Sequence, residues 1–161
     1  MMIRQENPHD RRAVHEAVSS AFGRSDEADL VDRLRKAGDS VISLVADENG
    51  RIVGHVLLSR MEAPFPALAL APVSVIPARQ GRGIGSALIK AAIDGARNEN
   101  WGAIFVLGDP AYYERFGFDA KAAAGFTSPY AGEHFMTLKL LPVLTAATGA
   151  LRHAPAFAGI D

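Results

Sequence analysis

A glycine-rich turn between an extended run and a helical run is the feature that most constrains what this chain can fold into. The apolar run Ala67 to Ile76 leads into Gln80-Gly81-Arg82-Gly83-Ile84-Gly85-Ser86, and Gly81 to Asn98 then has helical periodicity. Glycine lets a backbone approach a ligand closely, and the first N–H groups of a helix attract anions. The pattern therefore predicts a strand, turn and helix suited to a pyrophosphate.

Two familiar phosphate motifs do not fit this turn. A G-x-G-x-x-G motif begun at Gly81 requires glycine at Ser86, and one begun at Gly83 requires it at Leu88. A P-loop requires Gly-Lys-Ser/Thr, which is absent here. On glycine spacing alone, a tight turn without a ligand is the favoured interpretation, and Arg79 and Arg82 are either phosphate ligands or solvated side chains.

Charge and composition exclude several classes of protein. The 161 residues carry 17 Lys+Arg and 18 Asp+Glu, a net charge of −1, which argues against a nucleic-acid-binding surface. Cysteine is absent, so the chain has no disulfide, thiolate zinc site or cysteine nucleophile, and the five histidines lack metal-site spacing. No apolar run reaches about 18 residues. We therefore expect a cytoplasmic protein with no metal site and no membrane or nucleic-acid partner.

The order of the remaining patterns predicts an α/β (α+β) fold with a mixed sheet. Helices are expected over Pro8 to Ser20, Ser25 to Gly38 and Ala111 to Phe116. Strands are expected over Val41 to Ala46, Ile52 to Leu58, Ala103 to Leu107 and His134 to Leu140. Asn49-Gly50 predicts a hairpin turn, and Pro72, which cannot donate a ladder hydrogen bond, predicts a bulge or an unpaired position.

No linker or repeat divides the chain, so we expect a single domain over 1–161. Residues 145–161 are rich in Ala, Gly and Pro. They form either a loose tail or an edge strand covering a cleft, with Leu151, Phe157 and Ile160 as apolar anchors.

Two motifs resemble those of the GNAT superfamily of acyl-CoA-dependent N-acetyltransferases. Gln80, Gly83 and Gly85 match its Q-x-x-G-x-G pattern, and Gly108-Asp109-Pro110-Ala111-Tyr112-Tyr113-Glu114-Arg115-Phe116-Gly117-Phe118 is similar to its second conserved region. The second stretch is especially similar to a bacterial branch of predicted acetyltransferases. The resemblance extends over about residues 1–140.

The resemblance implies a GNAT-like fold, with a mostly antiparallel sheet, a splayed parallel strand pair and flanking helices. It implies that acetyl-CoA or CoA binds with its pantetheine arm between Ala67 to Ile76 and Ala103 to Leu107. The cofactor-binding residues it implies are Val73, Ser74, Val75, Gln80, Gly81, Arg82, Gly83, Ile84, Gly85, Ser86, Tyr112 and Phe116.

The same resemblance implies direct transfer of an acetyl group to a primary amine, with Tyr113 as the catalytic residue that assists the leaving thiolate. A phenol has a pKa near ~10 and a thiol near ~8.5, so a hydrogen bond to sulfur is more favourable than full proton donation. Tyr112 is the fallback for this role. Read without the glycine turn, both tyrosines simply pack a short helix on the sheet.

The resemblance leaves the acceptor and the general base open. Glu27, Glu62 and Glu114 are candidate bases, and none is assigned. The acceptor is a small molecule or a protein amine, the acyl group is acetyl or longer, and the family favours a homodimer. Two alternatives remain: a non-catalytic acyl-CoA-binding sensor or regulatory protein on the same fold, and a binding domain for another nucleotide-like phosphate.

Overall fold

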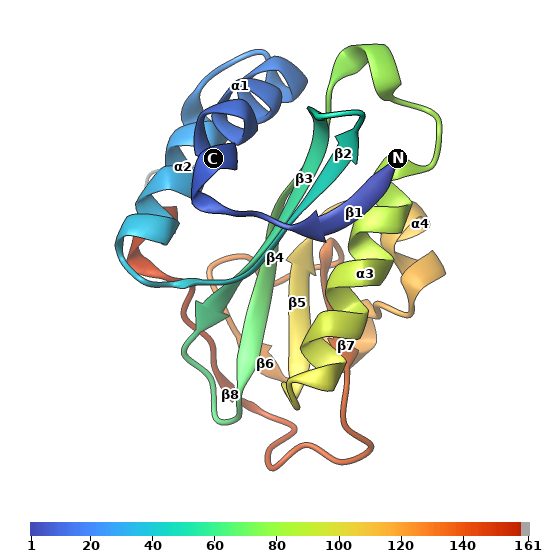
Figure 1. Cartoon of the computed structure of the whole chain (residues 1–161). Coiled ribbons are helices and arrows are strands. Elements are labelled where there is room, and N and C mark those ends of the chain that lie inside the picture. The colour runs from blue at the N-terminus through green and yellow to red at the C-terminus, as the bar shows by residue number, and fades with distance from the viewer. Residues whose placement is uncertain (159–161) are drawn as a thin grey trace.

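In the computed structural model, which describes residues 1–158, a mixed sheet lies between two layers of helices (Figure 1). Its strand order is β1-β2-β3-β4-β5-β7, and β4 and β5 run parallel while the other neighbours run antiparallel. The strands are β1 (Met2–Gln5), β2 (Ser40–Glu48), β3 (Arg51–Met61), β4 (Ala67–Val75), β5 (Ala103–Leu107) and β7 (Phe135–Lys139). The predicted fold class is confirmed.

Helices cover both faces of this sheet. They are α1 (Arg11–Phe22), α2 (Asp26–Lys36), α3 (Ile84–Asn98), α4 (Pro110–Tyr113) and α5 (Ala120–Ala123). In Figure 1, α1 and α2 lie on one side of the sheet and α3 lies on the other. Within the described residues, no helix is long and apolar enough to cross a bilayer.

The predicted start of α3 at Gly81 is wrong by three residues. Gly81 and Gly83 have φ angles of +76° and +81°, which a right-handed helix cannot contain. Gly83 is the N-cap residue, and the helix begins at Ile84. The glycines therefore form a loop before the helix.

The predicted hairpin and bulge are both present. Asn49 and Gly50 have φ angles of 53° and 90°, as a two-residue turn between β2 and β3 requires. In the β3–β4 ladder, Val56 pairs with Val73 but Leu58 pairs with Leu70, so the register shifts beside Pro72. The missing N–H of proline accounts for a break at this place.

The parallel pair β4–β5 is paired over part of its length only. Ala67, Leu68 and Ala69 pair with Ala103, Ile104 and Phe105, and the ladder ends there although both strands continue. Beyond this point the strands diverge. This divergence opens the centre of the sheet.

The C-terminal segment returns to the body of the protein. β8 (Gly149–Ala150) pairs in parallel with β6 (Phe126–Thr127) in a second small sheet. Leu151 and Phe157 are buried, and the backbones of Arg152 and Glu62 form a bridge. The third expected anchor, Ile160, lies outside the described residues.

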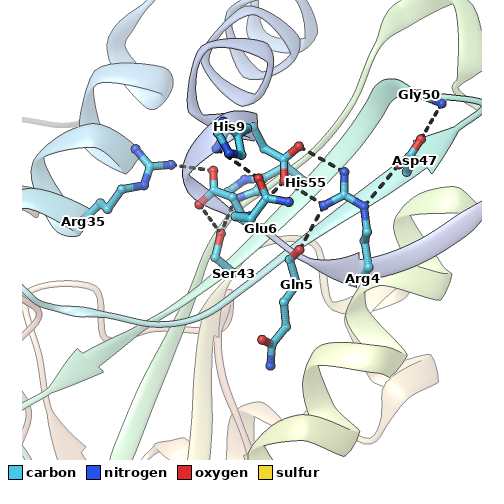
Figure 2. A network of polar contacts seen from close by, with 11 residues as sticks. Arg4, Gln5, Glu6, His9, Arg35, Ser43, Asp47, Gly50 and His55 are labelled. Atoms are coloured by element: carbon cyan, nitrogen blue, oxygen red, sulfur yellow. Dashed lines mark hydrogen bonds and ion pairs between the residues drawn. The ribbon is translucent and has the colours of Figure 1, made fainter.

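A polar network joins β1, β2, β3 and α2 on the opposite side of the sheet from α3 (Figure 2). Arg35 donates to Glu6 at 2.6 Å, and the Ser43 hydroxyl donates to the same carboxylate at 3.0 Å. Because that hydroxyl has a single hydrogen, His55 Nε2 donates to Ser43 across 2.8 Å. His55 Nδ1 is therefore an unprotonated nitrogen, buried without a partner among residues 1–158.

Candidate active site

The divergence of β4 and β5 creates a cavity of about 360 Å³. Its walls are the bulged part of β4, the end of β5, the junction of α1 and α2, and the C-terminal segment. Side chains that face it include those of Phe22, Glu27, Val73, Tyr113, Tyr130 and His153. Residues more than 100 positions apart in sequence thus meet around one space, which is mostly apolar.

The glycine loop adjoins the start of α3 and is open on its outer side. Apart from the glycine itself and its two neighbours in the chain, no described residue has an atom within 4 Å of where a Cβ would stand on Gly81 or Gly83. The side chain of Gln80 donates to the Val75 carbonyl oxygen at 3.0 Å and so braces the loop against the end of β4. The loop therefore presents exposed backbone ahead of a helix N-terminus, the geometry that suits a phosphate group.

The two arginines beside the loop differ in their surroundings. Arg79 donates to Glu48 at 2.9 Å, and this hydrogen bond lowers the pKa of the Glu48 carboxyl. Arg79 thus links the loop to the β2–β3 hairpin. Arg82 is exposed within the loop itself, and it is the better placed of the two to meet an anion.

Tyr112 lies against the first turn of α3. Its hydroxyl is 3.5 Å from Ser86 Oγ, and a Cβ on Gly85 would be 3.3 Å from the same hydroxyl. The ring of Phe116 packs edge-on against it at 5.4 Å. This region therefore brings Gly85, Ser86, Tyr112 and Phe116 together.

Arg115 belongs to the same cluster, although the sequence analysis did not single it out. Its guanidinium lies 4.5 Å from the centre of the Tyr112 ring and donates to Ser86 Oγ at 3.3 Å. The signal available in the sequence was its position three residues after Tyr112, which places both on one side of a helical turn. Arg115 adds a positive charge beside the N-terminus of α3.

Tyr113 points away from this cluster and into the cavity. Its ring packs so closely on Gly108 that a Cβ there would lie 2.5 Å from Tyr113 Cε2, so the glycine makes room for the tyrosine. Burial, with a smaller contribution from Tyr112, raises the Tyr113 pKa to about 12. Its hydroxyl has no hydrogen-bond partner among residues 1–158, and it stays protonated at neutral pH.

The other residues implied by the resemblance occupy different environments. Val73 and Val75 are half-buried, and Val73 lines the cavity. Ser74 lies between them on the opposite face of β4, with a buried hydroxyl that has no partner within the described part of the chain. Ile84 is buried in the core under the loop. Side chains of Ser74 and Ile84 therefore support the site from beneath.

Of the three candidate bases, Glu27 is the one that lines the cavity. Its carboxylate accepts a hydrogen bond from Arg24 at 3.0 Å, and this interaction, against the opposing effect of burial, lowers the Glu27 pKa. Glu62 and Glu114 are exposed, and neither lines the cavity. Glu27 is thus ionised at neutral pH, which suits binding of an ammonium group better than accepting its proton.

This combination of a split parallel strand pair, a glycine loop and a cavity between them agrees with the comparisons with known proteins. The model of the acetyltransferase (GNAT) family matches residues 11–118. The chain is 38% identical over 130 residues to the uncharacterized N-acetyltransferase YjhQ of Escherichia coli K12, covering 75% of this chain and 71% of YjhQ. The chain belongs to the GNAT acetyltransferase family.

Two solved structures extend the similarity to almost the whole fold. The YhbS acetyltransferase of Escherichia coli, crystallised with CoA, superposes with a TM-score of 0.91 at 28% identity and covers 99% of this chain and 93% of its own. A GNAT acetyltransferase of Brucella melitensis in complex with acetyl-CoA has a TM-score of 0.82 at 33% identity, with 97% of each chain covered. The expected family is therefore confirmed.

Proposed function

We propose that this chain is an N-acetyltransferase that moves an acetyl group from acetyl-CoA to a primary amine by direct attack. The observation that carries this proposal is the cavity between β4 and β5, with Tyr113 on its wall, next to an open glycine loop. The CoA and acetyl-CoA bound to the two similar structures support acetyl-CoA as the co-substrate.

In this proposal, the exposed N–H groups from Gly81 to Ser86 bind the pyrophosphate, with Arg82 and Arg115 contributing charge. Val73 and Val75 border the path of the pantetheine arm, and Gln80 holds the loop in place. Acetyl-CoA supplies the acetyl thioester. The residues of β4 and α4 hold its reacting end inside the cavity, where a buried environment strengthens polar interactions.

Tyr113 assists the departing sulfur by donating a hydrogen bond. With its pKa raised to about 12, the phenol is a much weaker acid than a thiol, whose pKa is near ~8.5. Complete proton transfer to the thiolate is therefore unfavourable, while a hydrogen bond to the developing negative charge remains available. Because the Tyr113 hydroxyl has no partner among residues 1–158, it has no hydrogen bond within that part of the chain to break before it acts.

We further propose that residues 1–161 act as one acetyltransferase domain, in which the C-terminal segment completes the acceptor side. His153 and Phe157 line the cavity, and the segment that carries them is tied to the body by β8 and by the bridge between Arg152 and Glu62. A non-catalytic sensor would need the glycine loop but not an accessible space beside Tyr113.

The test combines binding with turnover in the purified chain. Calorimetry measures the affinity for CoA, and release of free thiol from acetyl-CoA is followed with and without a mixture of primary amines. An enzyme releases thiol only when an amine is added, together with an acetylated product seen by mass spectrometry. Tight CoA binding with no amine-dependent release would instead identify a sensor, and absence of CoA binding would overturn both.

A further inference from the structure

The wall of the cavity contributed by the C-terminal part of the chain is aromatic. The imidazole of His153 packs edge-on between the rings of Tyr130 and Phe157, with centroid distances of 4.8 Å and 5.2 Å. These three rings line the cavity together with Phe22, which is 42% exposed at the end of α1. Flat apolar groups fit such a wall because aromatic rings pack well edge to face.

The charges around the cavity are unsuited to an acceptor with several positive charges. Among the described residues that line it, Glu27 has the acidic side chain, and both of its oxygens already accept hydrogen bonds from Arg24. Burial lowers the pKa of His153 to about 4, so the imidazole is neutral at physiological pH. A single ammonium group can pair here with Glu27, whose charge is partly compensated by Arg24. A second ammonium group finds no other carboxylate among the described residues that line the cavity.

The size of the cavity limits the acceptor further. Its volume of about 360 Å³ is near the lower end of the range typical for small-molecule sites, ~300 to 1,000 Å³. Part of that space lies between the diverging strands, where the acetyl end of the co-substrate belongs in the proposed function. The remainder holds a small acceptor.

We propose that the acceptor is a primary amine carried on an uncharged apolar body about the size of one aromatic ring. The body lies among Phe22, Tyr130, His153 and Phe157, and the amine points toward Glu27 and Tyr113. This inference rests on the proposed acetyltransferase activity. It makes the tail and the end of α1 the determinants of acceptor specificity.

The experiment compares three amines under identical conditions with the full chain and acetyl-CoA. They are 2-phenylethylamine, 1,5-diaminopentane and the amide of Nα-acetyl-lysine, which represent an apolar amine, a dication and a protein side chain. We expect kcat/KM for 2-phenylethylamine to exceed that for each of the others by about tenfold or more. A tenfold lower kcat/KM is the effect expected when an amine lacks one favourable contact between an apolar body and the cavity wall.

A charge introduced on the wall provides the decisive variant. Phe22→Glu places an unpaired carboxylate at the cavity, so the ratio of kcat/KM between 2-phenylethylamine and 1,5-diaminopentane should fall about tenfold. Val143→Glu makes the same change at an exposed apolar residue away from the cavity, and there the ratio should stay constant. Because a ratio is measured within one sample, partial misfolding cannot produce the shift.

The possible failures are distinguishable. Faster turnover of the dication or the lysine amide by the wild-type chain overturns the acceptor class while leaving the acetyltransferase proposal intact. A ratio that is equal in wild type and Phe22→Glu overturns the placement of the acceptor body. Absence of acetylated product with all three amines and with the wider mixture overturns the acetyltransferase proposal and this inference with it.

Discussion

Two polar regions of this protein differ in how far their side chains are enclosed, since one is sealed in the core and the other lines the cavity. In the network of Figure 2, Glu6, Arg35, Ser43 and His55 Nε2 are mutually bonded and tie β1 and α2 to the sheet. In the cavity, the partly buried Tyr113 has no hydrogen-bond partner within residues 1–158, and His153 Nδ1 is buried there without one. His55 Nδ1 is also unpaired but is sealed in the core, whereas Tyr113 and His153 line the cavity, where a ligand can bond to their unpaired atoms.

The largest expected effect comes from removing the unpaired hydroxyl. Tyr113→Phe should lower kcat by roughly 10- to 1,000-fold, by analogy with lost acid or oxyanion donors, while CoA affinity changes little. The reason is that the hydroxyl interacts with sulfur mainly as negative charge develops there. Steady-state kinetics with a working amine, paired with CoA titrations, measure both quantities.

Tyr112→Phe is the matched variant for this comparison. Its hydroxyl lies beside Ser86 rather than in the cavity, so its loss should alter CoA affinity and leave the chemical step nearly intact. If Tyr112→Phe is the inactive variant, or if Tyr113→Phe retains wild-type turnover when chemistry is rate-limiting, the assignment of the leaving-group residue is wrong.

The next largest effect is expected at the glycine loop. Gly83→Val should weaken CoA binding about 10- to 100-fold, because its side chain occupies open space where the pyrophosphate would approach and strains a positive φ. Gly38→Val imposes similar strain, at a φ of +79° and with open space around its Cβ, just after α2. Calorimetry that finds equal losses in both variants would assign the effect to strain and remove the loop from the binding site.

The buried network around His55 predicts a pH dependence of stability. Burial lowers the pKa of His55 to about 3, whereas histidine in the unfolded chain titrates near ~6.5. Between these values the unfolded state binds the proton and the folded state does not. The free energy of unfolding should therefore fall as pH decreases through this window, by up to about 1.4 kcal/mol per pH unit from this residue.

Denaturant titrations at pH 7, 6, 5 and 4 measure this slope. His55→Gln should make the curve shallower by the contribution of one proton, even though the variant is less stable throughout. His9→Gln, at an exposed position, is the control and should keep the wild-type slope. Parallel curves for wild type and His55→Gln would show that the buried imidazole does not control acid stability.

The smallest effect is expected at Arg115. Arg115→Gln should reduce CoA affinity about threefold at low salt, because an exposed charge beside a phosphate contributes modestly and is screened. The difference should shrink as salt is added. Arg12→Gln removes an exposed charge from α1 and should leave the affinity unchanged. A loss that is independent of salt would point to packing on Tyr112 instead.

Much of the fold follows from local signals in the sequence. The Asn49-Gly50 turn, the break at Pro72 and the order of strands around α3 were predicted correctly because each depends on neighbouring residues. The start of α3 was misplaced because helical periodicity continued into glycines whose φ angles are positive. Pattern alone does not separate a loop glycine from a helical one.

The parts that were missed depend on contacts between distant segments. β6 was not predicted, and an edge strand within 145–161, where β8 lies, was one of two alternatives; β6 and β8 have two residues each, and each is a strand only because the other lies beside it. Likewise, nothing near His153 in the sequence indicates that it packs against Tyr130 or faces the same cavity as Glu27. The roles of the cofactor residues and of Tyr113 came from the family resemblance, and they remain predictions for the experiments above.

The walls of the cavity have a consequence for how such a protein can change during evolution. The family model ends at residue 118, after the glycine loop and Tyr113, whereas Tyr130, His153 and Phe157 all lie beyond it. Substitution of these wall residues alters one side of the cavity while the strand pair and the loop stay intact. In the proposed function, a lineage could therefore acquire a new acceptor by changing these wall residues while keeping β7, the strand that pairs with β5, and so inherit the use of acetyl-CoA unchanged.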